Sequence, residues 1–116
     1  QIFEKQPHRD LAFILVKLLK KSQELGLTLS ELNIGGGLGI SYTSDDNPPS
    51  IEEWVKNVSE SVMEACLDSN LSFPKLIAEP GRSLIGSAGV TAYTVGSRKE
   101  IPGLHTYLAI DGGMSI

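Results

Sequence analysis

The sequence is poor in cysteine and in long apolar runs. Its single cysteine, Cys66, cannot form an internal disulfide. Lys17 interrupts the stretch LAFILVKLL, which leaves no apolar run of membrane length, and no segment resembles a signal peptide. We therefore expect a cytoplasmic protein without a membrane span.

Positive charge is also scarce. Ten Lys and Arg residues stand against fourteen Asp and Glu residues, and the basic side chains form nothing longer than a pair such as Lys20-Lys21. Because nucleic-acid backbones are bound chiefly by Lys and Arg, this balance argues against a nucleic-acid partner and favours small molecules. The 116 residues, 41 % of them hydrophobic, allow one domain or less with a packed core.

Two amphipathic helices are predicted from apolar residues that recur at helical spacing. The first covers about residues 7–25, and Pro7 suits its opening turn. The second follows Ser50, which forms a capping-box signature with Glu53, and ends near residues 68–70.

A short apolar strand is predicted after the first helix, in ELNI (residues 31–34), and another after the second, in KLIAEPGR (residues 75–82). Apolar strands that alternate with helices are typical of a parallel sheet buried on both faces. The sequence therefore predicts an α/β architecture.

The pattern changes after Arg82. GVTAYTVGS (residues 89–97) and HTYLAIDGG (residues 105–113) are rich in β-forming residues, and only the turn-like RKEIPGL separates them. This predicts two antiparallel strands. We expect the chain to pass from one domain, residues 1–84, into a β-rich one, residues 85–116.

The stretch GGGLG, residues 35–39, is open to three interpretations. A dinucleotide fingerprint fits poorly, because Tyr42 stands where its third glycine should be and no helix begins before Ser50. A flexible turn would rarely need four glycines in five positions, since each costs backbone entropy. A cradle of backbone N–H groups for a phosphate needs them, and such cradles occur at strand ends in α/β barrels.

A second candidate feature is Glu79, at the end of the second strand, with Arg82 three residues later. The two could be a structural ion pair at the rim of the sheet. Ligands of α/β proteins lie at the carboxyl ends of parallel strands, and a glycine cradle on the neighbouring strand end favours a functional role.

Three segments together resemble a known family. NIGGGLGISY, LIAEPGR and AIDGGM, in this order, are similar to segments of the diaminopimelate decarboxylases, which belong to the pyridoxal-phosphate decarboxylases with an alanine-racemase-like barrel. The resemblance implies part of a pyridoxal-phosphate-binding (α/β)8 TIM barrel, followed by the start of a C-terminal β domain. The chain is then expected to be an internal fragment.

The resemblance also implies site residues. Gly36 and Gly37 would bind the cofactor phosphate, Glu79 would pair with the pyridine nitrogen as the catalytic residue, and Arg82 would bind the phosphate and a substrate carboxylate. Pro80 and Gly81 complete the cofactor-binding motif. No metal is implied.

The activity implied is removal of carbon dioxide from meso-2,6-diaminopimelate to give L-lysine, by a homodimer in the cytoplasm or a plastid stroma. Related decarboxylases of arginine, ornithine or carboxynorspermidine share the cofactor motifs, and a non-catalytic segment that binds pyridoxal phosphate or a partner is the other alternative. The Schiff-base lysine and the stacking histidine of the family would precede the chain, with Gln1 the last residue of the histidine's motif, and the family's C-terminal Cys and Tyr would follow Ile116. The chain alone is expected to be inactive.

Other reactive side chains are expected to have structural roles. Cys66 and Trp54 fall on the apolar stripe of the second helix, which predicts core positions. His8 lies at a helix start and His105 beside a strand, where surface or structural roles are expected. Asp111 is assigned a structural role at the crossover strand.

Overall fold

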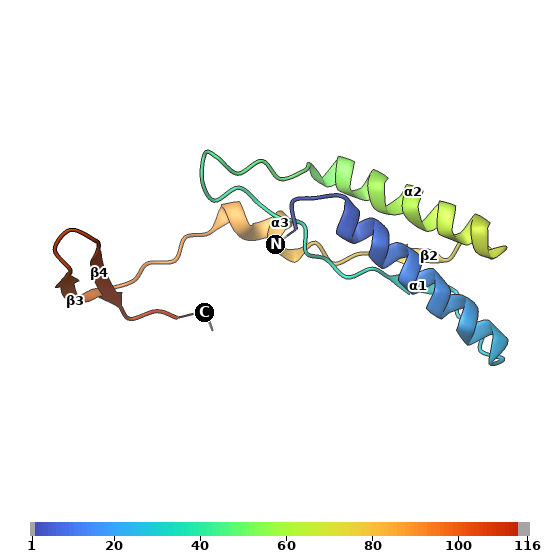
Figure 1. The fold of residues 1–116 in the computed structure, drawn as a ribbon. Helices are drawn as coiled ribbons and strands as arrows, with labels where there is room; N and C mark the ends of the chain where they lie inside the picture. Colours follow the sequence, from blue (N-terminus) through green and yellow to red (C-terminus); the bar gives the residue numbers. More distant parts are fainter. Residues whose placement is uncertain (1, 114–116) are drawn as a thin grey trace.

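The computed structural model describes residues 2–113, which form an elongated molecule of 63 × 29 × 28 Å (Figure 1). A helix-and-strand part occupies one end and a β-hairpin the other. The elements are α1 (Gln6–Glu24), β1 (Glu31–Asn33), α2 (Ile51–Ser69), β2 (Lys75–Ile77), α3 (Gly81–Ile85), a 3₁₀ turn η1 (Gly86–Ala88), β3 (Val95–Glu100) and β4 (Thr106–Ile110).

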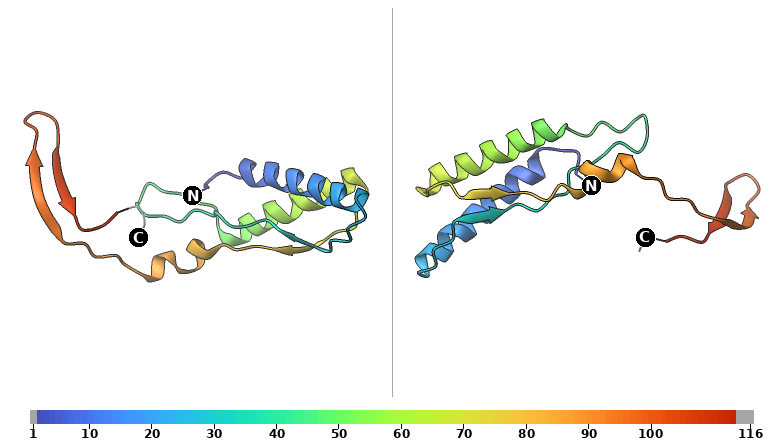
Figure 2. Two further views of the ribbon diagram at one scale, coloured as in Figure 1. Left: turned by 90° about the horizontal axis from the view of Figure 1, so that it is seen from below. Right: turned by 180° about the vertical axis from the view of Figure 1, so that it is seen from behind.

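The first part has the predicted α/β architecture. Strands β1 and β2 pair in parallel, with Leu32 opposite Leu76. Figure 2 shows α1 and α2 on one side of these strands, and both helices pack on them through one hydrophobic core. The parallel pairing follows because the connection through α2 brings the chain back to the same end of the sheet.

The core is built from the apolar stripes of the two helices. In α1, Ala12 and Val16 are fully buried, and in α2 the side chains of Trp54 and Cys66 are buried as predicted. Full burial of a side chain of the size of Val16 contributes about 1.5–3 kcal/mol. Burial also raises the pKa of the Cys66 thiol, which keeps it protonated and unreactive.

The capping box predicted at the start of α2 is present. The N–H of Glu53 donates to Ser50 Oγ at 3.1 Å, and the Glu53 carboxylate accepts from the N–H of Ser50 at 3.0 Å. The backbone hydrogen bond from Ser50, and then the charge of Lys5, lower the pKa of Glu53. These contacts satisfy two N–H groups at the helix end and set where α2 begins.

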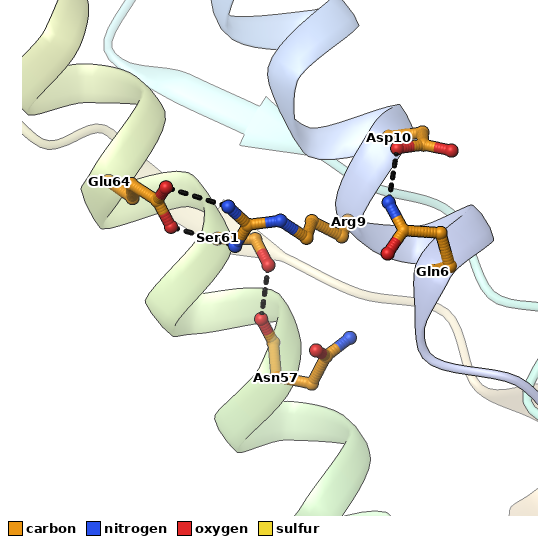
Figure 3. Close-up of polar contacts among 6 residues, drawn as sticks. All are labelled: Gln6, Arg9, Asp10, Asn57, Ser61 and Glu64. Carbon is orange, nitrogen blue, oxygen red and sulfur yellow. Dashed lines mark hydrogen bonds and ion pairs between the residues drawn. The ribbon is translucent and has the colours of Figure 1, made fainter.

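An ion pair joins the two helices across their exposed side (Figure 3). The Arg9 guanidinium donates to both carboxylate oxygens of Glu64, at 2.6 and 2.7 Å. This pair raises the pKa of Arg9 and lowers that of Glu64. Because both side chains remain more than a third exposed, the pair orients the helices more than it stabilises them.

The second part is the antiparallel hairpin β3–β4, with Lys99 opposite Tyr107. The antiparallel arrangement is confirmed, but the bounds of its first strand were wrong. Residues 89–94 are not in a strand, and the predicted turn residues 98–100 belong to β3. The tight turn sits later, where the N–H of Ile101 donates to the His105 carbonyl at 2.9 Å, and this contact sets the register.

Two further findings complete the fold. Strand β2 ends at Ile77, and the residues from Gly81 onward form the short helix α3, which the sequence did not predict. No helix within residues 2–113 is long and apolar enough to cross a membrane. Gln1 and Met114, named in the motif comparison, lie outside the described residues.

Candidate functional site

The carboxyl ends of β1 and β2 lie side by side and carry the two predicted motifs. We call residues 35–39 the glycine loop and residues 79–82 the EPGR turn. The ladder extends past the strands, because the N–H of Ile34 donates to the Ile77 carbonyl at 3.0 Å and the N–H of Glu79 to the Gly35 carbonyl at 2.7 Å. The structure therefore brings Gly36 and Glu79 together at one edge of the sheet.

Packing against the neighbouring strand end requires a glycine at position 36. A Cβ atom at this position would overlap the backbone carbonyl oxygen of Glu79. From the sequence we expected that a bound phosphate would require the bare backbone. The neighbouring strand end already requires a glycine at position 36. Any other residue type would prevent the two motifs from lying so close together.

The carbonyl groups of the three consecutive glycines all accept hydrogen bonds from the protein. Gly35 accepts from the N–H of Glu79, Gly36 from His8 Nε2 at 3.1 Å, and Gly37 from the N–H of Ile2 at 2.9 Å.

The N–H groups of Gly36 and Gly37 have no acceptor among residues 2–113. Gly35 and Gly37 have φ values of +67° and +94°, which other residue types rarely adopt. The N–H groups of Gly35 and Gly39 are engaged, by Asn33 Oδ1 and the Ile2 carbonyl. A loop with its three glycine carbonyls engaged and two adjacent N–H groups unengaged has the polarity that binds an anion such as a phosphate. The residues present therefore fit a phosphorylated cofactor.

His8 holds the glycine loop against the helices. The residue is 3 % exposed, and its ring makes an edge contact with the Trp54 ring, at 5.4 Å between centroids. Because a carbonyl oxygen only accepts, the ring nitrogen that faces Gly36 must carry the proton. His8 is thus structural and not a surface residue. The helical spacing of His8, Ala12 and Val16 on one buried stripe was the signal for this burial.

Glu79 is exposed, and its carboxylate accepts a hydrogen bond from Asn33 Nδ2 at 2.5 Å. The Oδ1 atom of Asn33 accepts from the N–H of Gly35 at 2.8 Å. Sequence reasoning missed Asn33. It ends β1 at an exposed position of the strand, beyond the buried Leu32, and this alternation could have identified it as a residue facing the site.

Arg82 lies in the first turn of α3 and is exposed. It forms no ion pair with Glu79, so the alternative of a structural pair at the sheet rim is wrong. The N–H of Gly81 donates to the Glu79 carbonyl at 2.8 Å, and the Ser83 hydroxyl to the Pro80 carbonyl at 2.7 Å. The backbone of the turn is therefore held while the guanidinium stays accessible.

The segment behind the glycine loop contains no helix until Ile51. Asp46 closes this segment by accepting from the N–H of Tyr42 at 2.9 Å and of Thr43 at 2.8 Å. These backbone bonds, first that of Thr43, lower the pKa of Asp46. A dinucleotide fingerprint requires a helix directly behind the glycines, so the structure argues against it.

The remaining reactive side chains lie away from this edge. His105 is exposed in the hairpin and makes an edge contact with the Tyr107 ring at 6.3 Å. Asp111 accepts from the N–H of Thr94 at 2.8 Å, which lowers the pKa of its carboxyl group and closes the base of the hairpin. Within residues 2–113 no group of three His, Cys, Asp or Glu residues could hold a metal ion.

Comparison with known proteins gives a family match and close relatives. Residues 1–86 match the family described as pyridoxal-dependent decarboxylase, pyridoxal binding domain. The chain is 61 % identical over 115 residues to diaminopimelate decarboxylase of Synechocystis sp., which covers 99 % of the chain and 24 % of that protein. It is 51 % identical over 84 residues to the Bacillus subtilis diaminopimelate decarboxylase, covering 72 % of the chain and 19 % of that protein.

Two solved structures are also similar to this chain. The diaminopimelate decarboxylase of M. jannaschii superposes with a TM-score of 0.64 at 30 % identity, over 98 % of the chain and 26 % of that structure. The Helicobacter pylori enzyme, complexed with L-lysine, has a TM-score of 0.65 at 22 % identity over the same shares, which supports the fold. The chain spans about a quarter of the length of the relatives it matches.

Proposed function

Because the chain belongs to the pyridoxal-dependent decarboxylases, through the pyridoxal-binding domain that residues 1–86 match, we propose that it is part of an enzyme converting meso-2,6-diaminopimelate to L-lysine and carbon dioxide. The observation that carries this proposal is the pairing of the two unengaged N–H groups of Gly36 and Gly37 with Glu79 on the adjacent strand end. The 61 % identity to the Synechocystis enzyme supports the substrate.

The proposal includes an architecture. Residues 1–84 would be part of an (α/β)8 barrel of the alanine-racemase type, and residues 85–116 would lead into a C-terminal β domain. The likeness to the M. jannaschii structure and the end of the family match at residue 86 support this division. A homodimer in the cytoplasm, or in a plastid stroma, belongs to the same proposal.

The cofactor phosphate would be held by the N–H groups of Gly36 and Gly37. A phosphate carries about two negative charges and needs several convergent donors. Arg82 would add positive charge, since its guanidinium is exposed and free of Glu79. Pro80 and Gly81 hold the backbone of the EPGR turn in the shape that presents these groups.

Glu79 would face the pyridine nitrogen of the cofactor and keep a proton on it. Pyridoxal phosphate, when bound, supplies a ring that withdraws electrons from the bond to be broken, and a protonated nitrogen strengthens this effect. The carboxylate is exposed at the strand end, where a ring could reach it. Glu79 therefore contributes to the chemistry more than to binding.

A substrate carboxylate would bind to Arg82. A guanidinium binds a carboxylate through two parallel hydrogen bonds, which Lys cannot offer. One related structure, of the M. jannaschii enzyme, is described as a complex with L-lysine, the product expected here. Decarboxylation of arginine, ornithine or carboxynorspermidine is the alternative, since the residues of this site would contact parts of the substrate that all these amino acids share.

The test is release of carbon dioxide by the full-length protein with diaminopimelate, arginine, ornithine and carboxynorspermidine in parallel. We expect turnover with diaminopimelate and little with the others, and no turnover by the 116-residue chain alone. Preference for another amino acid would replace the substrate, and absence of turnover with all four would leave the non-catalytic alternative.

A variant tests the phosphate cradle itself. Gly37→Val places a branched side chain at a φ of +94° and at 3.2 Å from the Ile2 side chain, so the loop must distort. We expect weaker retention of pyridoxal phosphate on dialysis. Unchanged retention would refute the role of the glycine loop.

A further inference from the structure

Asn33 joins the two halves of the site through one amide group. Its Oδ1 atom accepts from the N–H of Gly35 at 2.8 Å, and its Nδ2 atom donates to Glu79 Oε1 at 2.5 Å. Resting on the proposed function, we propose that Asn33 is a positioning residue that holds the Glu79 carboxylate and the glycine loop as one unit.

The chemistry of the two neighbours selects an asparagine. The N–H of Gly35 can only donate and the Glu79 carboxylate can only accept, so the residue between them needs an acceptor and a donor on neighbouring atoms. Asparagine has both. Aspartate offers two acceptors and an alanine neither, so each of these substitutions removes a defined part of the contact.

The contact with Asn33 engages only one of the two carboxylate oxygens of Glu79. Its Oε1 atom is held by Asn33, whereas its Oε2 atom has no partner among residues 2–113. The backbone of Glu79 is held too, because its N–H donates to the Gly35 carbonyl and its own carbonyl accepts from Gly81. One oxygen is therefore anchored and the other is available for the cofactor nitrogen.

No cation competes for this carboxylate on the two strands. Lys75, the first residue of β2, pairs with Glu31 at 2.8 Å, at the opposite end of the strands. An uncharged donor such as Asn33 orients the carboxylate without cancelling its charge. That charge is what the protonated nitrogen of the cofactor requires.

The first experiment compares Asn33→Asp and Asn33→Ala in the full-length protein. Aspartate keeps an acceptor for Gly35 but sets a second carboxylate against Glu79. We expect its turnover to fall about tenfold with a changed absorption spectrum of bound pyridoxal phosphate, while cofactor affinity stays within about threefold of wild type. Alanine also frees the N–H of Gly35, so there both turnover and cofactor affinity fall.

The second experiment needs no activity. In the cofactor-free protein, Asn33→Asp lowers the melting temperature by roughly 2 °C, because two carboxylates then face each other. Adding Glu79→Gln restores it, since the new amide donates to the new carboxylate. Glu79→Gln alone keeps the bond from Asn33 and changes the melting temperature little.

Gln23→Ala serves as the matched control, since this exposed amide lies at the far end of α1. Wild-type turnover and spectrum in Asn33→Asp, or additive melting shifts in the double variant, would overturn the role of Asn33. If the wild-type protein releases no carbon dioxide, the proposed function fails, and the melting cycle still decides whether Asn33 and Glu79 are coupled.

Discussion

The glycine loop and the EPGR turn follow equivalent strands of one sheet, yet they differ in their hydrogen bonding and in the exposure of their side chains. The loop accepts hydrogen bonds from Ile2, His8 and Glu79, and its residues Leu38 and Gly39 are buried. The EPGR turn has a held backbone but exposed side chains at Glu79 and Arg82.

This difference separates two tasks. A loop with three consecutive carbonyls engaged loses little entropy when an anion binds to its free N–H groups, which makes it suited to holding a cofactor in place. Exposed charged side chains on a supported backbone can instead contact a cofactor ring and a substrate. Under the proposed function, the end of β1 mainly retains the cofactor, and the end of β2 mainly serves the chemistry.

Alanine substitutions at Gly36 and Gly81 are expected to give the largest contrast between the two strand ends. In Gly36→Ala the new methyl group would overlap the Glu79 carbonyl, and we expect unfolding to become easier by about 3 kcal/mol. In Gly81→Ala nothing lies within 4 Å of the new atom, so the change in stability should be below about 0.5 kcal/mol. Denaturant unfolding of the full-length variants measures both. Equal losses would remove the distinction between the two strand ends.

Glu79→Gln tests the chemical side. The glutamine keeps an acceptor for Asn33 but loses the negative charge, so turnover should fall about a hundredfold while pyridoxal phosphate stays bound. Steady-state rates and the cofactor content of the purified variant check this. Loss of the cofactor with retained specific activity per bound cofactor would assign Glu79 to retention instead.

His8→Phe tests the fastening of the loop. The phenyl ring can keep the contact with Trp54 but leaves the Gly36 carbonyl without its donor, at a cost of about 1 kcal/mol. We expect a few-fold weaker affinity for pyridoxal phosphate and unchanged turnover once the protein is saturated. A lower saturated turnover would mean that His8 acts on the chemistry as well.

The smallest expected effect is a loss of local stability near Asp46 at acidic pH. The backbone N–H groups of Thr43 and Tyr42 lower the pKa of Asp46, so its carboxylate stabilises the segment behind the glycine loop above the ordinary carboxyl range. This stabilisation is lost as the pH falls through the lowered pKa. Hydrogen exchange at Tyr42 and Thr43 should therefore accelerate in acid relative to the intrinsic rate. Asp46→Asn should remove this pH dependence, whereas Asp45→Asn, at the exposed neighbour, should leave it intact.

Prediction from sequence succeeded where the signal is local. Helical spacing and the Ser50–Glu53 capping box located both long helices to within one or two residues, because these patterns depend on neighbours along the chain. It was wrong about the start of β3, since strand bounds depend on the partner strand, and residues 89–94 have none. The five-residue helix α3 carries too short a pattern to be read.

The meeting of the two motifs at the candidate site was predicted from local patterns, and other parts of its arrangement were not. Glu79 and the glycines stood out as motifs, and the rule that parallel strands end at one edge predicted that they would meet. No role in the site was predicted for His8, or for Asn33 although it begins the segment NIGGGLGISY, because their roles arise from contacts across 28 and 46 positions of the chain.

The sequence by itself determined the helices, the parallel α/β order and the residue types that suit a phosphorylated cofactor, since all three depend on local pattern and composition. Only the tertiary structure decided which groups of those residues are free. It engages the glycine carbonyls and anchors one oxygen of Glu79. The physical reason is that hydrogen bonds between distant segments, through His8, Asn33 and Ile2, set the polarity of the site.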